Sequence, residues 1–463
     1  MSRTPRPILR LAGLTAAGLA GLLPAARGAS ASAAPRPNIV LIMADDLGYG
    51  DLGCFGSTKI ATPNIDQLAR QGTRFTQFYA GSPVCAPSRG VLLTGLHTGH
   101  GRIRQNSPDV GGELETFADG KEGGIRLSFT ANDHTFPELL KKAGYVTGAS
   151  GKWGVGEPGT DGTPGKHGFD EWLGYLNQNH APYYYTDYLW ENDHQRPIPE
   201  NAGGKHAVYS CDLMADFSID FVRRHRAQSF FLYLPYTIPH ERMEVPDLGA
   251  YAHNDWPEDA RIYAAMVTRL DGYVGRLMQE LDRLGLADNT LVLFTSDNGA
   301  VKKPRSQFLG SNGNLRGTKG TVYEGGIRAP MIVRWPGHVP AGRTSAEPWM
   351  LMDVYPTFAA IAGLQAPAGL DGRNVLPVLT GAQPTLGDRP LYWEFPTERL
   401  WQAVRLGHWK AVREGMDQPV ELYDLNSDEH EEHNVAAAHA DVVARLTAIL
   451  DSSHTPTPYW PAH

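Results

Sequence analysis

Four apolar segments of this chain each end in polar side chains of the kinds that bind ligands or react. The residues at these ends are Asp45 and Asp46, Lys152, His240, and Asp297 and Asn298. Helix signals lie between the segments, and strands that alternate with helices predict an α/β fold with a largely parallel sheet. Such sheets bind ligands outside the carboxyl ends of their strands, so these side chains are predicted to share one site.

Local sequence signals place the helices. Thr62 is the expected cap of a helix in TPNIDQLARQG, and Thr135 and Glu138 have the spacing of a capping box in HTFPELLKKAG. Residues 259–285 carry apolar side chains at helical spacing and lead into the apolar run NTLVLFTS. The alternation of strand and helix therefore continues through most of the chain.

The pattern changes at about residue 385. LWQAVRLGHWKAVRE and PVELYDLNS are typical of antiparallel strands, and HADVVARLTAILDSS is typical of a closing helix. We expect a main, catalytic domain over residues 36–375 and a small antiparallel-sheet α+β domain over residues 385–463.

The N-terminus has the order of a targeting segment. Cationic MSRTPRPILR precedes the apolar run LAGLTAAGLAGLLPAA, and small residues follow, which predicts a signal peptide over residues 1–33. The apolar run is short for a membrane span and contains Gly and Pro. We therefore expect a periplasmic or secreted protein with no membrane contact in its mature form; an uncleaved anchor is the alternative.

Charge and cysteine content narrow the classes of function. The chain has 50 acidic and 42 basic residues, a formal net charge of −8, which argues against a nucleic-acid partner. Three cysteines allow at most one disulfide even in an oxidising compartment. Cys54 and Cys211 could pair and leave Cys85 alone, or both could be packed thiols.

The acids at the two strand ends suggest a metal site. Asp45, Asp46, Asp297 and Asn298 offer only oxygen atoms, which suit a hard cation such as Ca²⁺ or Mg²⁺. One acidic pair alone would be explained by a helix cap or a solvated turn. Two pairs, each after an apolar strand, make a metal site as reasonable as that explanation.

The segment CAPSRGVLLTG reads as the start of a helix, with Cys85 at its beginning and Arg89 in its first turn. Free N–H groups and the helix dipole attract anions there, and Arg89 adds a fixed cation. A cysteine nucleophile needs a partner base and no hard cation beside it. From the residues alone, Cys85 is therefore best explained as a buried thiol.

CAPSRGVLLTG resembles the signature of the sulfatase family, C-x-P-S-R followed by a small apolar helix and Thr-Gly. The similarity extends through PNIVLIMADDLGYGDLGCFG, GKWGVG, TSDNG, LRGTKGTVYEGGIRAPMIVRWPG and ELYDLNSDEHEEHNVA, in that order, along nearly the whole mature chain. The resemblance implies an alkaline-phosphatase-like α/β/α sandwich with a mostly parallel central sheet and a small C-terminal α+β domain. It also implies that a formylglycine-generating enzyme oxidises Cys85 to formylglycine, whose hydrated aldehyde is the nucleophile.

The same resemblance implies roles for the matched residues. Ca²⁺, with Mg²⁺ as the less favoured ion, would be held by Asp45, Asp46, Asp297, Asn298 and the formylglycine at position 85. Arg89 would stabilise the nucleophile, Lys152 and Lys319 would bind sulfate oxygens, and His240, alone or with Lys319, would protonate the departing oxygen. For an isolated Lys or His, a solvated loop charge or a strand-end hydrogen bond would be the ordinary explanation.

One position departs from the family pattern. Many sulfatases have GKWHLG, in which the His helps to deprotonate the second hydroxyl, whereas this chain has GKWGVG with Gly154 at that place. His180, in the Tyr-rich segment LNQNHAPYYYTDYLW, is a candidate substitute base or substrate contact. A histidine packed among aromatic side chains is an equally good explanation for His180.

The sequence thus predicts a sulfuric ester hydrolase that acts on a sulfated substrate, most simply a sulfated carbohydrate. Two alternatives remain: a phosphonate monoester or phosphodiester hydrolase with the same fold, and a catalytically impaired protein that binds sulfated glycans. Gly154 favours the second alternative. The residues that argue against it are Cys85, Arg89, Lys152, His240 and Lys319.

Overall fold

A computed structural model describes residue 13 and residues 36–106, 109–116 and 122–461 of the 463-residue chain. The predicted signal peptide, residues 1–33, lies outside the described residues except for Gly13. Among the described residues, no helix has the length and apolar character needed to span a membrane.

An eleven-stranded sheet forms the centre of the fold, and its five middle strands are parallel. In spatial order these are β10 (Thr290–Ser296), β1 (Asn38–Ala44), β9 (Phe230–Pro235), β5 (Val146–Lys152) and β6 (Glu171–Tyr175). The expected α/β architecture with a mostly parallel sheet is therefore confirmed.

Antiparallel strands extend the sheet on both sides. Next to β10 lie β11 (Arg328–Arg334) and then β2 (Thr73–Tyr79), both antiparallel to their inner neighbours, and β2 also pairs with the short parallel strands β12 (Arg343–Ser345) and β13 (Trp349–Met350). On the other side β7 (Tyr188–Glu191) and β8 (His194–Pro197) continue from β6 as an antiparallel meander.

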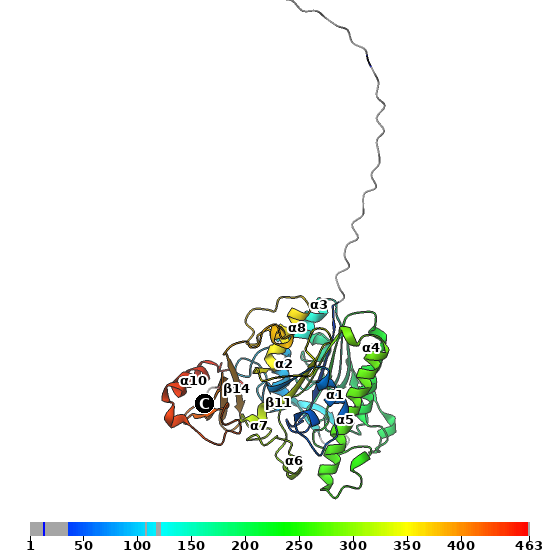
Figure 1. Ribbon diagram of the computed structural model, residues 1–463. Coiled ribbons are helices and arrows are strands. Elements are labelled where there is room, and N and C mark those ends of the chain that lie inside the picture. Colours follow the sequence, from blue (N-terminus) through cyan, green and yellow to red (C-terminus); the bar gives the residue numbers. More distant parts are fainter. Residues whose placement is uncertain (1–12, 14–35, 107–108, 117–121, 462–463) are drawn as a thin grey trace, which may run out of the picture. The chain divides into compact units, whose positions relative to one another are not determined.

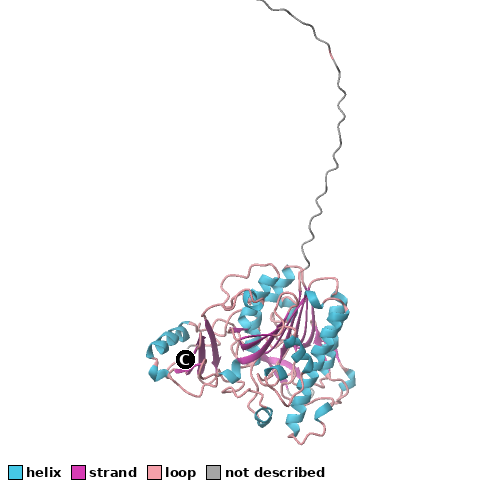
Figure 2. Cartoon of the chain, in the orientation of Figure 1, coloured by secondary structure: helices cyan, strands magenta, loops and turns pink. Residues whose placement is uncertain are grey.

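Helices cover both faces of the sheet (Figures 1 and 2). One face packs against α1 (Pro63–Arg70), α4 (Ser210–His225) and α5 (Glu258–Arg283), and the other against α2 (Cys85–Thr94), α3 (Phe136–Lys142) and α8 (Val354–Ile361). Alternate residues of β1 enter the two cores: Val40 and Ile42 lie in one, and Ile39 and Leu41 in the other. Burial on both faces explains the unbroken apolar run of this strand.

The two expected helix starts differ in how they are capped. At α3, Thr135 and Glu138 form the predicted capping box. At α1, Thr62 occupies the N-cap position, but its hydroxyl donates to Asp66 Oδ1 at 3.1 Å instead of capping the backbone. Three short helices, α6 (Pro304–Leu309), α7 (Glu324–Ile327) and α9 (Leu376–Leu379), lie in the connections after β10.

A separate antiparallel sheet forms near the C-terminus, as expected. It consists of β14 (Pro390–Pro396), β15 (Leu400–Leu406), β16 (Trp409–Glu414) and β17 (Glu421–Asp424), in that order. The closing helix α10 (Ala440–Ser452) packs on it through Leu446 and Leu450. The hairpin of β3 (Asp109–Thr116) and β4 (Glu122–Arg126) completes the elements. The boundaries 36–375 and 385–463 stay predictions.

All three cysteines are free thiols. Cys211 is buried in α4 and Cys54 is half-buried at the edge of the same core. A disulfide between Cys54 and Cys211 is therefore absent, and the alternative of two packed thiols agrees with the structure.

Candidate active site at the carboxyl edge of the sheet

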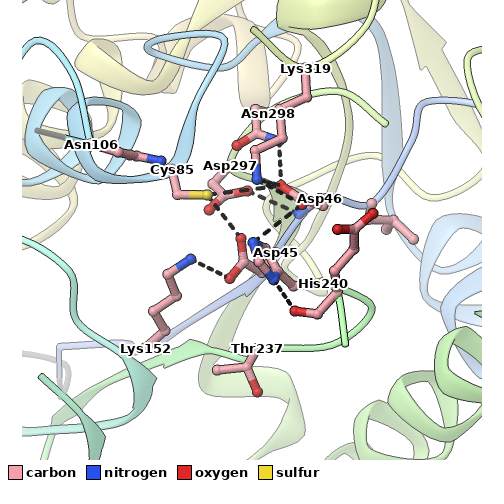
Figure 3. A network of polar contacts seen from close by, with 12 residues as sticks. Asp45, Asp46, Cys85, Asn106, Lys152, Thr237, His240, Asp297, Asn298 and Lys319 are labelled. Carbon is pink, nitrogen blue, oxygen red and sulfur yellow. Dashed lines mark hydrogen bonds and ion pairs between the residues drawn. The ribbon is translucent and has the colours of Figure 1, made fainter. Parts of the chain in front are cut away.

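The acidic residues meet where β1 and β10 end (Figure 3). The two strands pair in register up to Ala44 and Ser296, so Asp45 and Asp46 come next to Asp297. The backbone N–H of Asp46 donates to Asp297 Oδ1 at 3.2 Å, and Asn298 Nδ2 donates to Asp46 Oδ1 at 2.8 Å. All of these side chains are buried.

The donor set fits a hard cation. Asn298 Oδ1 is buried and has no hydrogen-bond partner among the described residues, although an unsatisfied buried acceptor is costly. Burial, followed by the charge of Asp45, raises the pKa of Asp297 to about 7. A divalent cation beside these groups would satisfy the amide oxygen and favour the ionised form of Asp297.

The other two carboxyls are held ionised by cations. Burial opposes the ionisation of Asp45, but the surrounding cations, led by Lys152, hold its pKa below the ordinary value. Burial likewise opposes ionisation of Asp46, whose pKa is lowered by cations led by Lys319. Lys152 Nζ lies 2.7 Å from Asp45 Oδ2, and Lys319 Nζ lies 2.7 Å from Asp46 Oδ2.

Cys85 is the first residue of α2 and faces the carboxylates (Figure 3). Its Sγ lies 3.2 Å from Asp45 Oδ1 and 3.8 Å from Asp46 Oδ1. Burial, reinforced by the charge of Asp45, raises the pKa of the Cys85 thiol well above its ordinary value. An unmodified Cys85 is therefore a protonated thiol, the opposite of the activated thiolate that a cysteine nucleophile requires.

Arg89 lies one turn further along α2 and is fully buried. Its Nε and Nη2 donate to Asp297 Oδ2 at 3.1 and 2.7 Å, and its Nη1 donates to the carbonyl oxygen of Lys152 at 2.6 Å. Burial opposes the charge of Arg89, but Asp297 and Asp45 outweigh burial and raise its pKa. Arg89 is therefore a fixed cation that joins α2 to the ends of β5 and β10.

His240 reaches the cluster from a loop, because β9 ends earlier than expected. The sequence predicted a strand up to His240, but the strand ends at Pro235. His240 Nδ1 donates to the carbonyl oxygen of Glu241, and its Nε2 lies 3.5 Å from Asp46 Oδ2. Burial lowers the pKa of His240 even though Asp46 and Asp45 act in the opposite direction.

His180 lies in an aromatic environment. Its Nε2 is 2.7 Å from Thr186 Oγ1, and its ring packs edge-on against Tyr175 and close to Tyr188. Burial lowers the pKa of His180 to about 3, so the ring is neutral at physiological pH. The contacts seen at His180 agree with a histidine packed among aromatics, and they do not join it to the carboxylate cluster.

Two residues that sequence analysis did not single out lie beside the predicted ones. Asn106 Oδ1 accepts a hydrogen bond from the backbone N–H of Ala86, next to Cys85, at 2.9 Å. Gln178 occupies the space in front of Gly154, where a Cβ would come within 2.9 Å of Gln178 Nε2. Neither residue lies in a sequence motif, and both lie in loops whose course the sequence pattern does not predict. For Gln178 the one signal in the sequence was that it lies two residues before His180.

Two family models match the chain. The Sulfatase model covers residues 37–364, and the model described as N-sulphoglucosamine sulphohydrolase, C-terminal, covers residues 318–455. N-acetylgalactosamine-6-sulfatase of Canis lupus familiaris is 36% identical over 409 residues, which span 84% of this chain and 74% of that protein.

Solved structures agree with these matches. The crystal structure of Ps i-CgsB superposes with a TM-score of 0.79 at 32% identity and covers 92% of this chain and 95% of that one. The structure of Ps i-CgsB in complex with k-i-k-neocarrahexaose gives a TM-score of 0.78 at 31% identity, with the same coverage of 92% and 95%.

Proposed function

The chain belongs to the sulfatase family and is therefore an enzyme that hydrolyses sulfate esters; we propose that its substrate is a sulfated carbohydrate, that Cys85 is converted to formylglycine, and that the cluster binds Ca²⁺. The observation that carries this proposal is the position of Cys85. Its Sγ lies 3.2 Å from Asp45 Oδ1, inside a ring of buried acids and cations, and its thiol is protonated.

Asp45, Asp46, Asp297 and Asn298 would hold the cation, together with residue 85. A hard cation at this edge would polarise sulfate oxygens and favour ionisation of the hydroxyl at residue 85. The buried Asn298 Oδ1 without a partner among the described residues supports this assignment. Mg²⁺ offers the same charge but requires a more regular octahedral ligand set, so Ca²⁺ is the proposed ion.

A buried thiol cannot serve as the nucleophile beside three carboxyls, which supports modification of Cys85. Formylglycine supplies a hydrated aldehyde, in which one hydroxyl attacks and the other allows release. Arg89, with its two hydrogen bonds to Asp297, is positioned one turn away to stabilise the ionised hydroxyl. A formylglycine-generating enzyme is the maturation partner that this proposal requires, and residues 1–33 are proposed to direct export to the periplasm or the medium.

Charge balance supports binding of a sulfate ester. Without ligands, three acids and three cations balance each other's charge in the site. The acids are Asp45, Asp46 and Asp297, and the cations are Arg89, Lys152 and Lys319. A divalent cation would leave an excess positive charge of two, which the ester anion and an ionised hydroxyl at residue 85 would neutralise. In this arrangement Lys152 and Lys319 exchange part of their contact with carboxylates for contact with sulfate oxygens.

His240 is the proposed general acid for the departing oxygen. Its lowered pKa describes the site without substrate, where burial dominates. A bound sulfate anion would raise the pKa of His240, because a nearby negative charge favours the imidazolium form. Nδ1 is fixed by its hydrogen bond to the carbonyl of Glu241, so the proton to be transferred is on Nε2. Lys319 is proposed to assist His240 as the acid, and His180 stays a proposed substitute base or substrate contact.

The class of substrate is proposed from the relatives. One acts, by its name, on N-acetylgalactosamine 6-sulfate, and another was solved with k-i-k-neocarrahexaose. Both relatives exceed 30% identity across most of this chain.

Two measurements test the proposal. Trypsin releases residues 75–89, and the mass of that peptide from enzyme purified from its natural host should fit formylglycine rather than cysteine. 4-Nitrophenyl sulfate should be hydrolysed by the wild type and not by Cys85→Ala, whereas Cys54→Ala should keep full turnover. Unmodified cysteine in an active preparation would overturn the mechanism, and a strong preference for an aryl phosphonate over the aryl sulfate would favour the phosphonate hydrolase instead.

A further inference from the structure

We propose that Tyr263 and Asp51 are positioning residues that hold Asp46 in the backbone conformation in which its carboxylate faces the cation site. Neither residue is one of the proposed metal ligands, and neither takes part in the proposed chemistry. The inference rests on the proposed function, because it concerns the cation site at the ends of β1 and β10.

Asp46 has an uncommon backbone conformation. Its φ is +64°, in the left-handed region that residues other than glycine rarely adopt, although aspartate tolerates it better than most. In this conformation its carboxylate contacts Asn298 Nδ2 at 2.8 Å and Lys319 Nζ at 2.7 Å (Figure 3). A return to negative φ would turn the carboxylate away from both groups. A residue keeps such a conformation only where its surroundings fix it.

Tyr263 reaches the backbone of Asp46 from helix α5, and its side chain is fully buried. Its hydroxyl lies 2.6 Å from Asp51 Oδ2 and 3.3 Å from the carbonyl oxygen of Asp46. The hydroxyl has one proton, and the shorter distance, which is typical of an O–H···O⁻ bond, identifies Asp51 as the main acceptor. The carbonyl of Asp46 is the second, weaker acceptor of a three-centre hydrogen bond.

Asp51 closes the turn that follows Asp46. Its Oδ2 also accepts from the backbone N–H of Gly48 at 2.8 Å, and its own N–H donates to the carbonyl of Gly48 at 3.2 Å. Burial raises the pKa of Asp51 to about 6, so the carboxyl is ionised at about pH 8 and accepts from both donors. Asp51 therefore joins the hydroxyl of Tyr263 to the turn that begins at Asp46.

Other hydrogen bonds hold the same turn from a different side. The backbone N–H of Leu47 donates to Ser296 Oγ, at the end of β10, at 3.1 Å, and the N–H of Gly50 donates to the carbonyl of Ser311, in the loop after α6, at 2.8 Å. Loss of the Tyr263 hydroxyl would release the turn on the side of α5 while these bonds remain. The expected result is a misdirected Asp46 in a turn that stays folded.

Variants of the purified enzyme test this role. Tyr263→Phe removes the hydroxyl and keeps the ring, Asp51→Ala removes both hydrogen bonds of the carboxylate, and Asp51→Asn keeps a neutral acceptor. Tyr251→Phe is the matched control, because Tyr251 is also buried and its hydroxyl joins Thr268 of α5 at 2.8 Å to the backbone N–H of Ala61 at 2.8 Å. The Ca²⁺ dissociation constant of each protein is measured by competition with a calcium-binding dye at about pH 8, where Asp51 is ionised. Thermal unfolding gives the Tm.

We expect Tyr263→Phe and Asp51→Ala to bind Ca²⁺ about 10- to 100-fold more weakly than the wild type, the loss typical of residues that orient a metal ligand. Asp51→Asn should keep part of the affinity, because its amide oxygen still accepts a hydrogen bond. Tyr251→Phe should lower the Tm by a similar amount as Tyr263→Phe but keep the wild-type dissociation constant.

Two results would overturn the positioning role while the wild type binds Ca²⁺. One is a wild-type dissociation constant in Tyr263→Phe or Asp51→Ala, and the other is an equal weakening in Tyr251→Phe, which would make the effect one of general stability. If Tyr263→Phe does not fold, the comparison of Asp51→Ala with Asp51→Asn decides. A wild-type enzyme that binds no Ca²⁺ would instead refute the proposed cation, and this inference with it.

Discussion

Gly154 is a glycine for a reason that the local backbone supplies. Its φ is +76°, in the left-handed region that side chains with a Cβ rarely adopt. The space that a side chain would enter is taken by Gln178, whose Nε2 would lie 2.9 Å from a Cβ. In this chain the amide of Gln178 therefore lies where a side chain at position 154 would begin. An amide can donate a hydrogen bond but cannot accept a proton, so it does not replace a base.

Gly154→Ala separates the backbone effect from the contact with Gln178. Gly159 has a φ of +75° with nothing within 4 Å of its Cβ position, so Gly159→Ala measures the backbone cost alone. Each substitution should cost about 1–2 kcal/mol of stability, seen as a lower Tm. Because the clashing atom is the end of a flexible side chain, Gly154→Ala should add little destabilisation beyond the backbone cost.

The double variant Gly154→Ala, Gln178→Ala completes this test. The Tm of the double variant should equal the Tm of Gln178→Ala minus the decrease in Tm that Gly159→Ala causes. The contact between position 154 and Gln178 has been removed in the double variant, whereas the backbone strain remains. A Gly154→Ala protein as stable as the wild type would contradict the assigned strain.

At the scale of elements, a buried charge network ties α7 to the C-terminal sheet. Lys410 of β16 forms ion pairs with Glu324 of α7 at 2.9 Å and with Glu431 at 2.8 Å, and all three side chains are fully buried. Glu431 Oε2 also accepts from the backbone N–H of Glu324 at 2.7 Å. Since α7 follows the loop that carries Lys319, the network anchors one wall of the site to the small sheet.

This network predicts a pH dependence of stability with a defined sign. Burial raises the pKa of Glu431 to about 7 from an ordinary value of 4.5. Between these two pH values the folded state therefore keeps a proton that the unfolded state releases. The stability contributed by protonated Glu431 is present at pH values below the unfolded pKa and is lost as the pH rises through about 7. Glu431→Gln cannot ionise, so its Tm relative to wild type should rise between about pH 5 and about pH 8.

Glu398→Gln is the matched control, because Glu398 is exposed on the turn between β14 and β15. Its Tm relative to wild type should stay constant over the same pH interval. The expected change for Glu431→Gln is on the order of 1–3 kcal/mol. A difference from wild type that is constant with pH, or that falls as pH rises, would show that Glu431 does not carry the proton.

The elements that could be predicted from sequence are those with a strong apolar period. β1 and β10 are buried on both faces, so their unbroken apolar composition is enough to identify them as strands. Parallel pairing of the two strands then brings Asp45 next to Asp297. β7 and β8 could not be predicted, because an edge meander with exposed polar residues such as His194–Pro197 has no apolar period. The positions of Asn106 and Gln178 could not be predicted for a related reason. Both residues lie in loops, and tertiary packing decides what a loop residue contacts.

At the scale of the whole molecule, the site lies where the two cores meet. Ile39 and Leu41 of β1 pack in one core, Val40 and Ile42 in the other, and the strand then ends directly in Asp45 and Asp46. Any cation bound by these carboxylates is bound to the strand that both cores share. Binding of the metal should therefore stabilise the whole molecule, because a ligand that binds only the folded state raises the free energy of unfolding.

Ca²⁺ at about one hundred times its dissociation constant should stabilise the protein by about 2.7 kcal/mol, and chelation should lower both the Tm and the turnover of 4-nitrophenyl sulfate. Asn298→Ala removes the buried oxygen that lacks a partner, without deleting a charge, and should abolish most of the Ca²⁺-dependent rise in Tm. Asn132→Ala, an exposed position, should keep the full rise.

A second acidic group, Asp428 with Glu432 and His433, lies at the surface of the C-terminal region. If Ca²⁺ raised the Tm of Asn298→Ala as much as that of the wild type, the stabilising ion would lie at such a surface group, and the assignment of the cation to the ends of β1 and β10 would be wrong.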